Sequence, residues 1–564
     1  MIPDMPPRTS FPPIFRRISR GKTFIGSLIT LLLACCTQSA TGLEFDFRAV
    51  ATRSEIRLDW EFSPKQFTEL GESTVFQIHA LPGTSAAVGV PKLSSESLLC
   101  EAKASDKNVR FPRFNRATDL VFSRIVLQCG SFAPVVRWVT DFDDLPLRRP
   151  QDRAAGSKKG VACLQDAEDG VALGVRQLNQ NIVVGSLMDL ASSEPKLSFE
   201  YEGRRIGLNM KGVAALDREL LAAFHNGQRV TGILLNLIGR STPQDSPLLH
   251  PLTPVSSVPI GPSAFNTATS EGVFYFRAMV HWLVDRYTRP DAEFGLLSGL
   301  VIGNEMQSHW SWYHLGEAEA QTVIAEYSHA LRIADLAARN VHPGFRCYLS
   351  LEHHWSLSAS KNPRKGFSGL EAIEGVNRLA KAEGDFPWAL AFHPYPEDLF
   401  NPAFWNDRTA PFRMDAPRIT FRNLEVLPAF LAQPRFLYRG AKRSIALTEQ
   451  GFHCPEGERG EELQAAAYAF AWKKVMQMPE VESFLYHRHV DHPQEHGLHC
   501  GIRRYDASAR HGMGPARKIH EVIRAAGTPE EERMFAFALG VIGRESWKDL
   551  LETHIESPAA RGAE

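Results

Sequence analysis

From residue 161 onward the chain alternates short apolar runs with longer amphipathic segments, and this alternation restricts the possible fold more than any other feature. Apolar runs of strand length are separated by segments with the helical period near 3.6. Apolar strands in alternation with helices are typical of a parallel sheet that helices cover on its outer faces. The predicted strands span residues 181–187, 230–236, 296–303, 346–352, 389–393, 444–449 and 483–487, and the predicted helices include 213–224, 272–287, 320–338 and 463–478.

An eighth strand is expected to end near Ala264-Phe265-Asn266, which would close a (β/α)8 TIM barrel over residues 160–530. The alternative is a doubly wound sheet, which usually carries a glycine-rich phosphate turn after its first strand. No G-x-G-x-x-G or Walker sequence occurs there. The barrel is therefore the predicted α/β fold, and residues 531–564 are expected to form a C-terminal tail, with a last helix around 530–551.

Residues 43–150 have a different pattern. Ile56, Leu58 and Trp60 alternate with charged residues, which indicates a half-buried strand. Further short strand-like runs with turn signals between them predict a small Ig-like β-sandwich domain, followed by a linker over residues 145–160. Cys100 and Cys129 both fall in this domain and form the preferred candidate disulfide, with free buried thiols as the alternative.

The first 42 residues predict export. Arg16, Arg17, Arg20 and Lys22 precede an apolar run from Phe24 to Cys36 that is short for a membrane span, as in a signal peptide. Leu32-Leu33-Ala34-Cys35 also resembles a lipoprotein cleavage box, so a lipid anchor at Cys35 stays open beside ordinary cleavage. The mature protein is expected to lack a transmembrane span and to be periplasmic, extracellular or anchored at the cell surface. The formal net charge of −1 argues against a nucleic-acid binder.

The predicted strand ends carry the candidate chemistry, because the active site of a (β/α)8 barrel lies at the carboxyl ends of its strands. Glu305 and Glu449 each follow an apolar run directly, at strands four and seven by the predicted count. Burying a charged carboxylate at the end of a strand costs free energy, so a function is expected for it. For either residue alone, a structural ion pair is the alternative. Two of them suit glycoside hydrolysis, which uses one carboxyl as acid and one as nucleophile or base.

Gly303-Asn304-Glu305 and Thr448-Glu449-Gln450-Gly451 resemble the strand-four and strand-seven signatures of glycoside hydrolase clan A. The resemblance implies that Glu305 is the acid/base and Glu449 the nucleophile of a retaining glycosidase, which needs no cofactor. It further implies that Asn304 holds the 2-hydroxyl of the sugar and that Tyr395 hydrogen-bonds the nucleophile.

The chain also resembles a bacterial family of exported proteins catalogued as a domain of unknown function, from about residue 45 to about 520. The resemblance implies the same architecture and a glycosidase-like site without naming a substrate. It is carried by the segments Pro112–Phe114, Arg137–Phe142, Ala264–Thr267, Phe392–Glu397, Glu449–His453 and His487–His492.

Other polar and aromatic residues near the predicted strand ends are expected to contact a carbohydrate substrate. Aromatic rings pack on the C–H faces of sugars, and imidazoles and amides bond their hydroxyls. Two alternatives remain: a metal-dependent barrel hydrolase centred on His487, His489 and His492, and a non-catalytic polysaccharide-binding protein. Metal is the less favoured use of these histidines. Barrel metallohydrolases of the amidohydrolase type carry a His-x-His motif on the first strand, whereas His487 and His489 fall on the last predicted strand. The expected substrate contacts are His393, His353, His487, His489, Asn181, Trp310 and Trp355, with Trp312 and Trp405 as further aromatic candidates.

Overall fold

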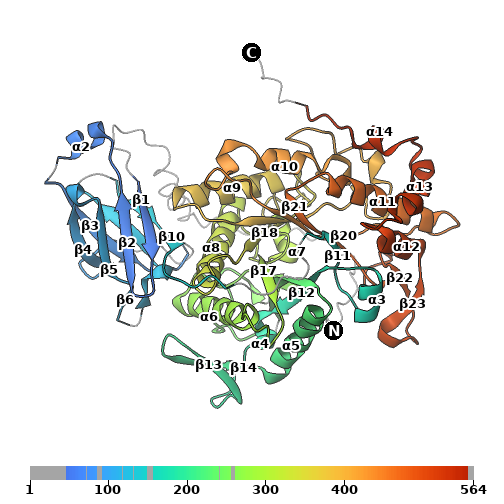
Figure 1. Ribbon diagram of the computed structural model, residues 1–564. Coiled ribbons are helices and arrows are strands. Elements are labelled where there is room, and N and C mark those ends of the chain that lie inside the picture. Colours follow the sequence, from blue (N-terminus) through green and yellow to red (C-terminus); the bar gives the residue numbers. More distant parts are fainter. Residues whose placement is uncertain are drawn as a thin grey trace, which may run out of the picture.

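The computed structural model describes residues 46–556, except residues 72, 86–91, 117, 131–132, 149–155, 240–241 and 256–260. A β-sheet region near the N-terminus lies beside a larger barrel (Figure 1). Within this described part, no helix is long and apolar enough to cross a membrane. The signal segment expected at residues 1–42, with Cys35, lies outside the described residues.

Eight parallel strands form a closed ring, which confirms the predicted barrel. Each strand pairs with the next along the chain, and the pairing of β11 with β21 closes the ring. The strands β17 to β19 are almost wholly buried on both faces, which explains their continuous apolar runs. The ring consists of β11 (Lys159–Val161), β12 (Gln177–Val183), β15 (Arg229–Ile238), β17 (Leu297–Ile302), β18 (Cys347–Glu352), β19 (Ala389–His393), β20 (Ile445–Gln450) and β21 (Val481–Tyr486).

A helix follows each barrel strand, and polar caps fix several of the starting points. The side chains of Asn209, Thr269 and Ser368 each accept a hydrogen bond from the first turn of their helices. The predicted last helix is two helices, α13 (Glu531–Ile542) and α14 (Trp547–Leu551), because Gly543 turns the chain at φ 77°. The helices around the ring are α3 (Ala167–Ala172), α5 (Met210–His225), α6 (Ser270–Tyr287), α8 (Ala320–Arg339), α9 (Gly369–Ala382), α10 (Val426–Leu431), α11 (Gly460–Met476) and α12 (Lys518–Ala525).

The prediction of the eighth strand near residues 264–266 was wrong. The missing strand is β11, only three residues long, with a glycine at its centre, so it carries no apolar period. Gly160 is required there, because a Cβ would lie 2.8 Å from the Gln177 carbonyl oxygen and 2.9 Å from Leu485 Cγ. The segment before residue 264 is instead β16 (Gly261–Ser263), which pairs antiparallel with the end of β15. Three barrel strands precede β17 in the prediction and in the structure. β17 is therefore still the fourth barrel strand and β20 the seventh.

Two four-stranded sheets make up most of the N-terminal region. Their strand orders are β10-β1-β2-β5 and β4-β3-β8-β9, and the rings of Trp60 and Phe76 meet between them at 5.6 Å. The region also bonds to the barrel: Trp138 Nε1 donates to Glu383 at 2.7 Å, and Arg113 donates to Asn340 at 2.9 Å. The strands are β1 (Phe47–Ala51), β2 (Glu55–Trp60), β3 (Val75–Leu81), β4 (Leu98–Lys103), β5 (Asn108–Pro112), β8 (Arg124–Gln128), β9 (Val135–Arg137) and β10 (Val139–Phe142).

The preferred disulfide was also wrong, since Cys100 and Cys129 are both free. Cys100 lies on β4 and Cys129 directly follows β8, and these two strands flank β3 on opposite sides. Strands separated by a third are about 9–10 Å apart, beyond the reach of a disulfide. Both residues therefore belong to the alternative of free thiols.

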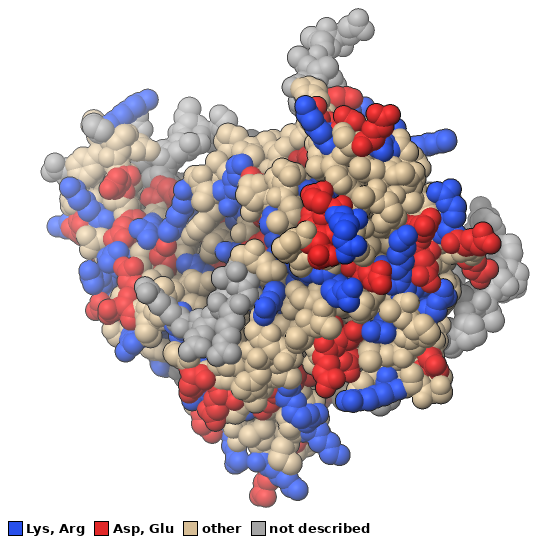
Figure 2. Space-filling model, turned by 45° about the vertical axis from the view of Figure 1, so that its right-hand side comes forward, with Lys and Arg blue, Asp and Glu red and all other residues tan. Residues whose placement is uncertain are grey.

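The charged side chains are mixed in sign on the face of the molecule shown in Figure 2. Lys and Arg side chains stand next to Asp and Glu, without a broad area of either sign among the residues drawn in colour. This arrangement agrees with the net charge of −1 and gives no footprint for a polyanion such as nucleic acid on this face.

Candidate active site

Glu305 lies three residues beyond β17, at a turn that aims its side chain into the barrel mouth. Its backbone has φ 40°, a left-handed conformation that is uncommon for a residue with a side chain and often marks a functional site. The turn is fixed by a hydrogen bond of 2.9 Å from the Glu305 N–H to the Ser350 hydroxyl on neighbouring β18. The carboxyl is thereby held in a buried position with only 9% of the residue exposed.

Glu449 lies on β20 itself, near the carboxyl end of the seventh strand. The Tyr395 hydroxyl, two residues beyond β19, donates a hydrogen bond of 3.0 Å to Glu449 Oε1. Asn179 on β12 crosses the ring and donates to the Thr448 carbonyl at 2.9 Å, which fixes the backbone next to the carboxylate. Glu449 is thus held by contacts to two other barrel strands or their ends.

The two carboxyls and His393 lie close together. One carboxylate oxygen of Glu305, one of Glu449 and a ring nitrogen of His393 all lie within 4.8 Å of one another. His393 Nδ1 is 2.7 Å from Glu305, and its Nε2 is 3.1 Å from the Thr448 hydroxyl. Retaining glycosidases hold their carboxyls about 5–5.5 Å apart and inverting ones about 6.5–9.5 Å. The limit of 4.8 Å between one oxygen of each carboxyl is shorter than the separations of inverting enzymes.

The environment drives the proton affinities of the two carboxyls apart. Burial raises the pKa of Glu305 to about 6, against the lowering effect of His393, and the charges of Glu352 and Glu449 add to the rise. Burial acts in the same sense on Glu449, but His487, His393 and the Tyr395 hydroxyl outweigh it and lower its pKa. Two neighbouring titratable groups whose pKa values shift in opposite directions are typical of a catalytic acid and its partner base.

His487, at the end of the last barrel strand, supplies positive charge beside Glu449. Burial alone would lower the pKa of His487, but the Cys163 side chain, Glu495 and Glu449 together raise it to about 10. Its Nε2 lies 3.2 Å from Glu495. Sequence reasoning missed Cys163, two residues beyond β11, because that strand was not predicted. It also missed Glu495, which lies in a loop with no periodic signal.

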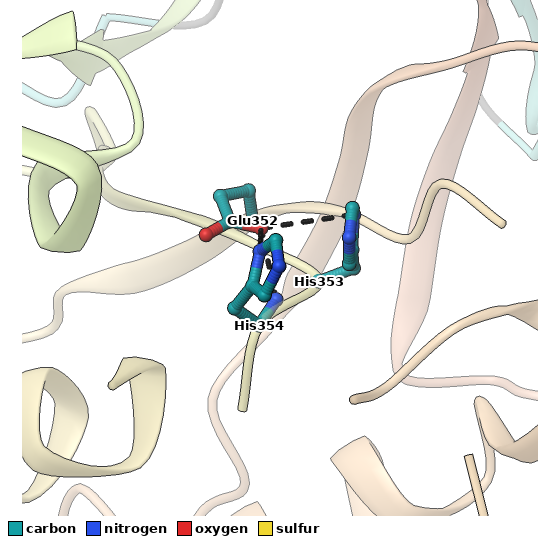
Figure 3. A group of neighbouring side chains, drawn as sticks. All are labelled: Glu352, His353 and His354. Carbon is teal, nitrogen blue, oxygen red and sulfur yellow. Dashed lines mark hydrogen bonds and ion pairs between the residues drawn. The ribbon is translucent and has the colours of Figure 1, made fainter. Parts of the chain in front are cut away.

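A third carboxylate, Glu352, is buried at the end of β18 and is surrounded by donors (Figure 3). Its oxygens accept hydrogen bonds from the Ser308 hydroxyl at 3.1 Å and from the His354 N–H and Nδ1 at 2.8 Å each, while His353 Nδ1 lies 3.6 Å away. Burial opposes ionisation, but His354 and His353 together lower the pKa of Glu352 to about 2. The strand-end pattern includes this residue, yet nothing in the sequence shows that it adjoins Glu305.

Two groups of side chains in the described residues offer three metal-ligand atoms each within 4.8 Å: Glu352 with His353 and His354, and Glu305 with His393 and Glu449. In the first group, His354 already contacts Glu352 through Nδ1 and Arg418 through Nε2 at 3.2 Å. In the second, both nitrogens of His393 are bonded. A cation in either place would have to displace these hydrogen bonds, and in the first it would meet the Arg418 guanidinium.

Three of the predicted substrate contacts are fully buried in the structure. Trp355 is fully buried and donates its indole N–H to the Met414 carbonyl, because residues 414–417 fold back over it. His489 is fully buried and bonds Asp169 at 2.7 Å, away from the carboxyl pair. His393 is also fully buried, and its two ring nitrogens contact Glu305 and the Thr448 hydroxyl.

The remaining predicted contacts keep groups available for a ligand. Asn304 is partly exposed between β17 and Glu305, and Asn181 is exposed on the same side of β12 as Val183, which packs in the barrel interior. His353 has a buried Nδ1 without a hydrogen bond among the described residues. Trp310 is partly covered by Lys365, whose Nζ lies 4.0 Å from its ring, whereas Trp312 nearby is 42% exposed. Trp405 packs partly buried on the core.

The fold and the site together define the class: a (β/α)8 barrel with paired carboxyls at the ends of its fourth and seventh strands. Residues 151–550 match the family described as "Family of unknown function (DUF5722)". Because the match covers more than half of the chain, the protein belongs to this family. Comparison with curated protein sequences gives no match.

Several solved structures show a weaker similarity. A family 39 glycoside hydrolase from Bacteroides cellulosilyticus WH2 is 11% identical over 86% of this chain and 83% of its own, with a TM-score of 0.43. A family 1 β-glucosidase from Thermotoga maritima is 11% identical over 64% and 84%, with a TM-score of 0.39. The exo-β-1,4-mannosidase Op5Man5 from Opitutaceae bacterium strain TAV5 is 16% identical over 66% and 56%, with a TM-score of 0.36.

Proposed function

We propose that the protein is a retaining glycoside hydrolase in which Glu449 is the nucleophile and Glu305 the acid/base. One observation carries the proposal: an oxygen of buried Glu305 and an oxygen of partly buried Glu449 lie within 4.8 Å of each other, and the pKa of Glu305 is raised to about 6 while that of Glu449 is lowered. Double displacement needs this combination, because one group must give a proton while the other attacks as an anion.

The proposed reaction has two steps. Glu449 attacks the anomeric carbon, the bond to the leaving oxygen breaks, and that oxygen takes the proton of Glu305. Glu305, now ionised, then removes a proton from water, whose oxygen attacks the anomeric carbon and frees Glu449. Asn304, which precedes Glu305 in the chain, is proposed to bond the 2-hydroxyl of the sugar, and Asn181, His353 and Trp310 are proposed as further contacts.

The two other functions considered from the sequence have less support. For a metal-dependent hydrolase, His487, His489 and His492 would have to converge. His487 contacts Glu495, His489 contacts Asp169, and His492 accepts a hydrogen bond from the Gln494 N–H. For a non-catalytic binding protein, the carboxyl pair would be dispensable, yet both members are present with their supporting hydrogen bonds.

The stereochemistry of the product tests the mechanism. We expect hydrolysis of a susceptible aryl glycoside to give first the sugar with the anomeric configuration of the substrate, because two displacements at one carbon restore its configuration. Proton NMR during the first minutes of reaction, over a panel of aryl glycosides and polysaccharides, reports this directly. Initial release of the opposite anomer would contradict double displacement and show that the protein inverts the configuration in a single displacement.

Tyr395→Phe tests the assignment of the nucleophile. The lost hydrogen bond to a carboxylate is worth about 1.5–3 kcal/mol, so the pKa of Glu449 should rise by about one to two units. Glu449 must be ionised to attack, and the acidic limb of the kcat/KM profile should therefore move to higher pH. A profile in which only the basic limb moves would show that Tyr395 acts on the acid instead.

We further propose that the protein is exported, with residues 1–42 as its signal and Cys35 as a possible site of lipid attachment. The support is the sequence pattern of basic residues followed by a short apolar run.

We also propose that the N-terminal sheets form an Ig-like sandwich that braces the barrel. The bracing role is supported by the hydrogen bonds from this region to Glu383 and Asn340.

A further inference from the structure

Three aromatic side chains contact one another in succession in the loops beyond the carboxyl ends of three barrel strands. Phe400 follows β19, His453 follows β20 and His499 follows β21. The ring centroids of Phe400 and His453 are 5.2 Å apart, and those of His453 and His499 are 5.7 Å apart. These three residues, here called the ring strip, come from three different loops on the rim that carries the carboxyl pair.

The two outer rings of the strip are exposed, and hydrogen bonds hold the backbone that carries them. Phe400 is 52% exposed and the His499 side chain 45%, while His453 is buried between them. The Asp398 side chain accepts a hydrogen bond of 3.0 Å from the Phe400 N–H, and His453 Nδ1 accepts one of 2.9 Å from the His499 N–H. Rings on a backbone that is already held in place cost less conformational entropy when a ligand packs on them.

One end of the strip lines a cleft of about 800 Å³ between the segments that follow β20 and β21. His499 belongs to both features, and Tyr505 adds a second exposed ring on the cleft wall at 47%. Cavities of this size hold ligands larger than a single sugar ring. The cleft also contains His492, one of the three histidines singled out in the sequence.

The charge of the cleft selects among saccharides. The lining has five carboxylates and three cations. The carboxylates are Glu456, Glu458, Glu461, Glu462 and Asp491, and the cations are Arg504, Arg517 and Lys518. All three cations are already paired: Arg504 with Glu461, Arg517 with Asp491 and Lys518 with Glu462. The excess carboxylates accept hydrogen bonds from hydroxyl groups and repel anions.

We propose that the ring strip and the cleft bind a chain of neutral sugar residues that continues from the bond cleaved between Glu305 and Glu449. The C–H faces of successive pyranose rings would pack on Phe400 and Tyr505, and their hydroxyls would bond the carboxylates of the cleft. This inference rests on the proposed function and gives it a substrate class: a neutral oligo- or polysaccharide, not an acidic one and not a simple monosaccharide conjugate.

Phe400→Ala tests the proposal by comparing two kinds of substrate. We expect the variant to lose on the order of 10-fold more kcat/KM on a neutral oligosaccharide than on an aryl monoglycoside, because only the chain reaches the strip. Phe114→Ala is the matched control, since Phe114 is 47% exposed on the N-terminal region and should leave the ratio unchanged. Equal losses of Phe400→Ala on both substrates would overturn the role of the strip.

Binding measurements separate this inference from the proposed function. Calorimetry with neutral gluco-, manno- and galacto-oligosaccharides and with oligogalacturonate needs no turnover. Binding of a neutral chain that Phe400→Ala weakens supports the strip, even if no glycoside is hydrolysed and the proposed function fails. Preference for oligogalacturonate, or neutral binding that Phe400→Ala does not change, would overturn the inference while leaving the carboxyl pair untouched.

Discussion

Glu449→Gln will reduce kcat/KM by on the order of 10⁴-fold or more on every glycoside that the protein cleaves, whatever the leaving group. The amide has nearly the shape of the carboxylate and can still accept the Tyr395 hydrogen bond, but it cannot form the covalent intermediate. Removing a nucleophile has effects of this size in other covalent mechanisms. Steady-state rates and the loss of any glycosylation burst measure the effect.

Glu480→Gln provides the matched control for that substitution. Glu480 precedes β21 at the opposite end of the barrel and pairs with Lys442 at 2.7 Å. A pair of this kind contributes roughly 0–1 kcal/mol to stability, so this variant should fold and keep its activity. A similar loss of activity in both variants, with altered unfolding, would show that Glu449 supports the fold and not the reaction.

Glu305→Gln is expected to have an effect that depends on the leaving group. General acid catalysis is worth about 10²–10⁴-fold, so an unactivated substrate should lose that much. An aryl glycoside with an activated leaving group needs little protonation, and its glycosylation step should largely survive. Rapid-mixing measurements of the burst on both substrates separate the two steps.

The pH dependence follows from the same residue. Glu305 must carry a proton, and its pKa is about 6, so the wild-type kcat/KM should fall as the pH rises through about 6. On the activated substrate this basic limb should flatten in Glu305→Gln, because the variant has no proton to lose there. If Glu305→Gln abolishes the burst and Glu449→Gln leaves it intact, the two roles are reversed.

The sequence by itself determined the barrel and the two carboxyls. Buried parallel strands produce continuous apolar runs, and the residue that follows such a run must lie at the rim where the strands end. Glu305 and Glu449 could be found in this way without knowing any contact. The Tyr395 hydrogen bond to Glu449 was also expected, on the strength of a resemblance, and the structure contains it.

Only the tertiary structure decided which rim residues lie beside the carboxyl pair. The hydrophobic period and the order of the strands do not specify how the long loops fold. The loop that carries Met414 folds over Trp355 and covers its indole ring. His489 alternates with His487 along one strand end, so the two imidazoles have different partners, Asp169 and Glu495. β11 escaped prediction because three residues centred on Gly160 have too few apolar side chains to show a period. Whether a polar side chain at a strand end meets the substrate, a neighbouring loop or the core depends on contacts between segments far apart in the sequence, which local patterns do not encode.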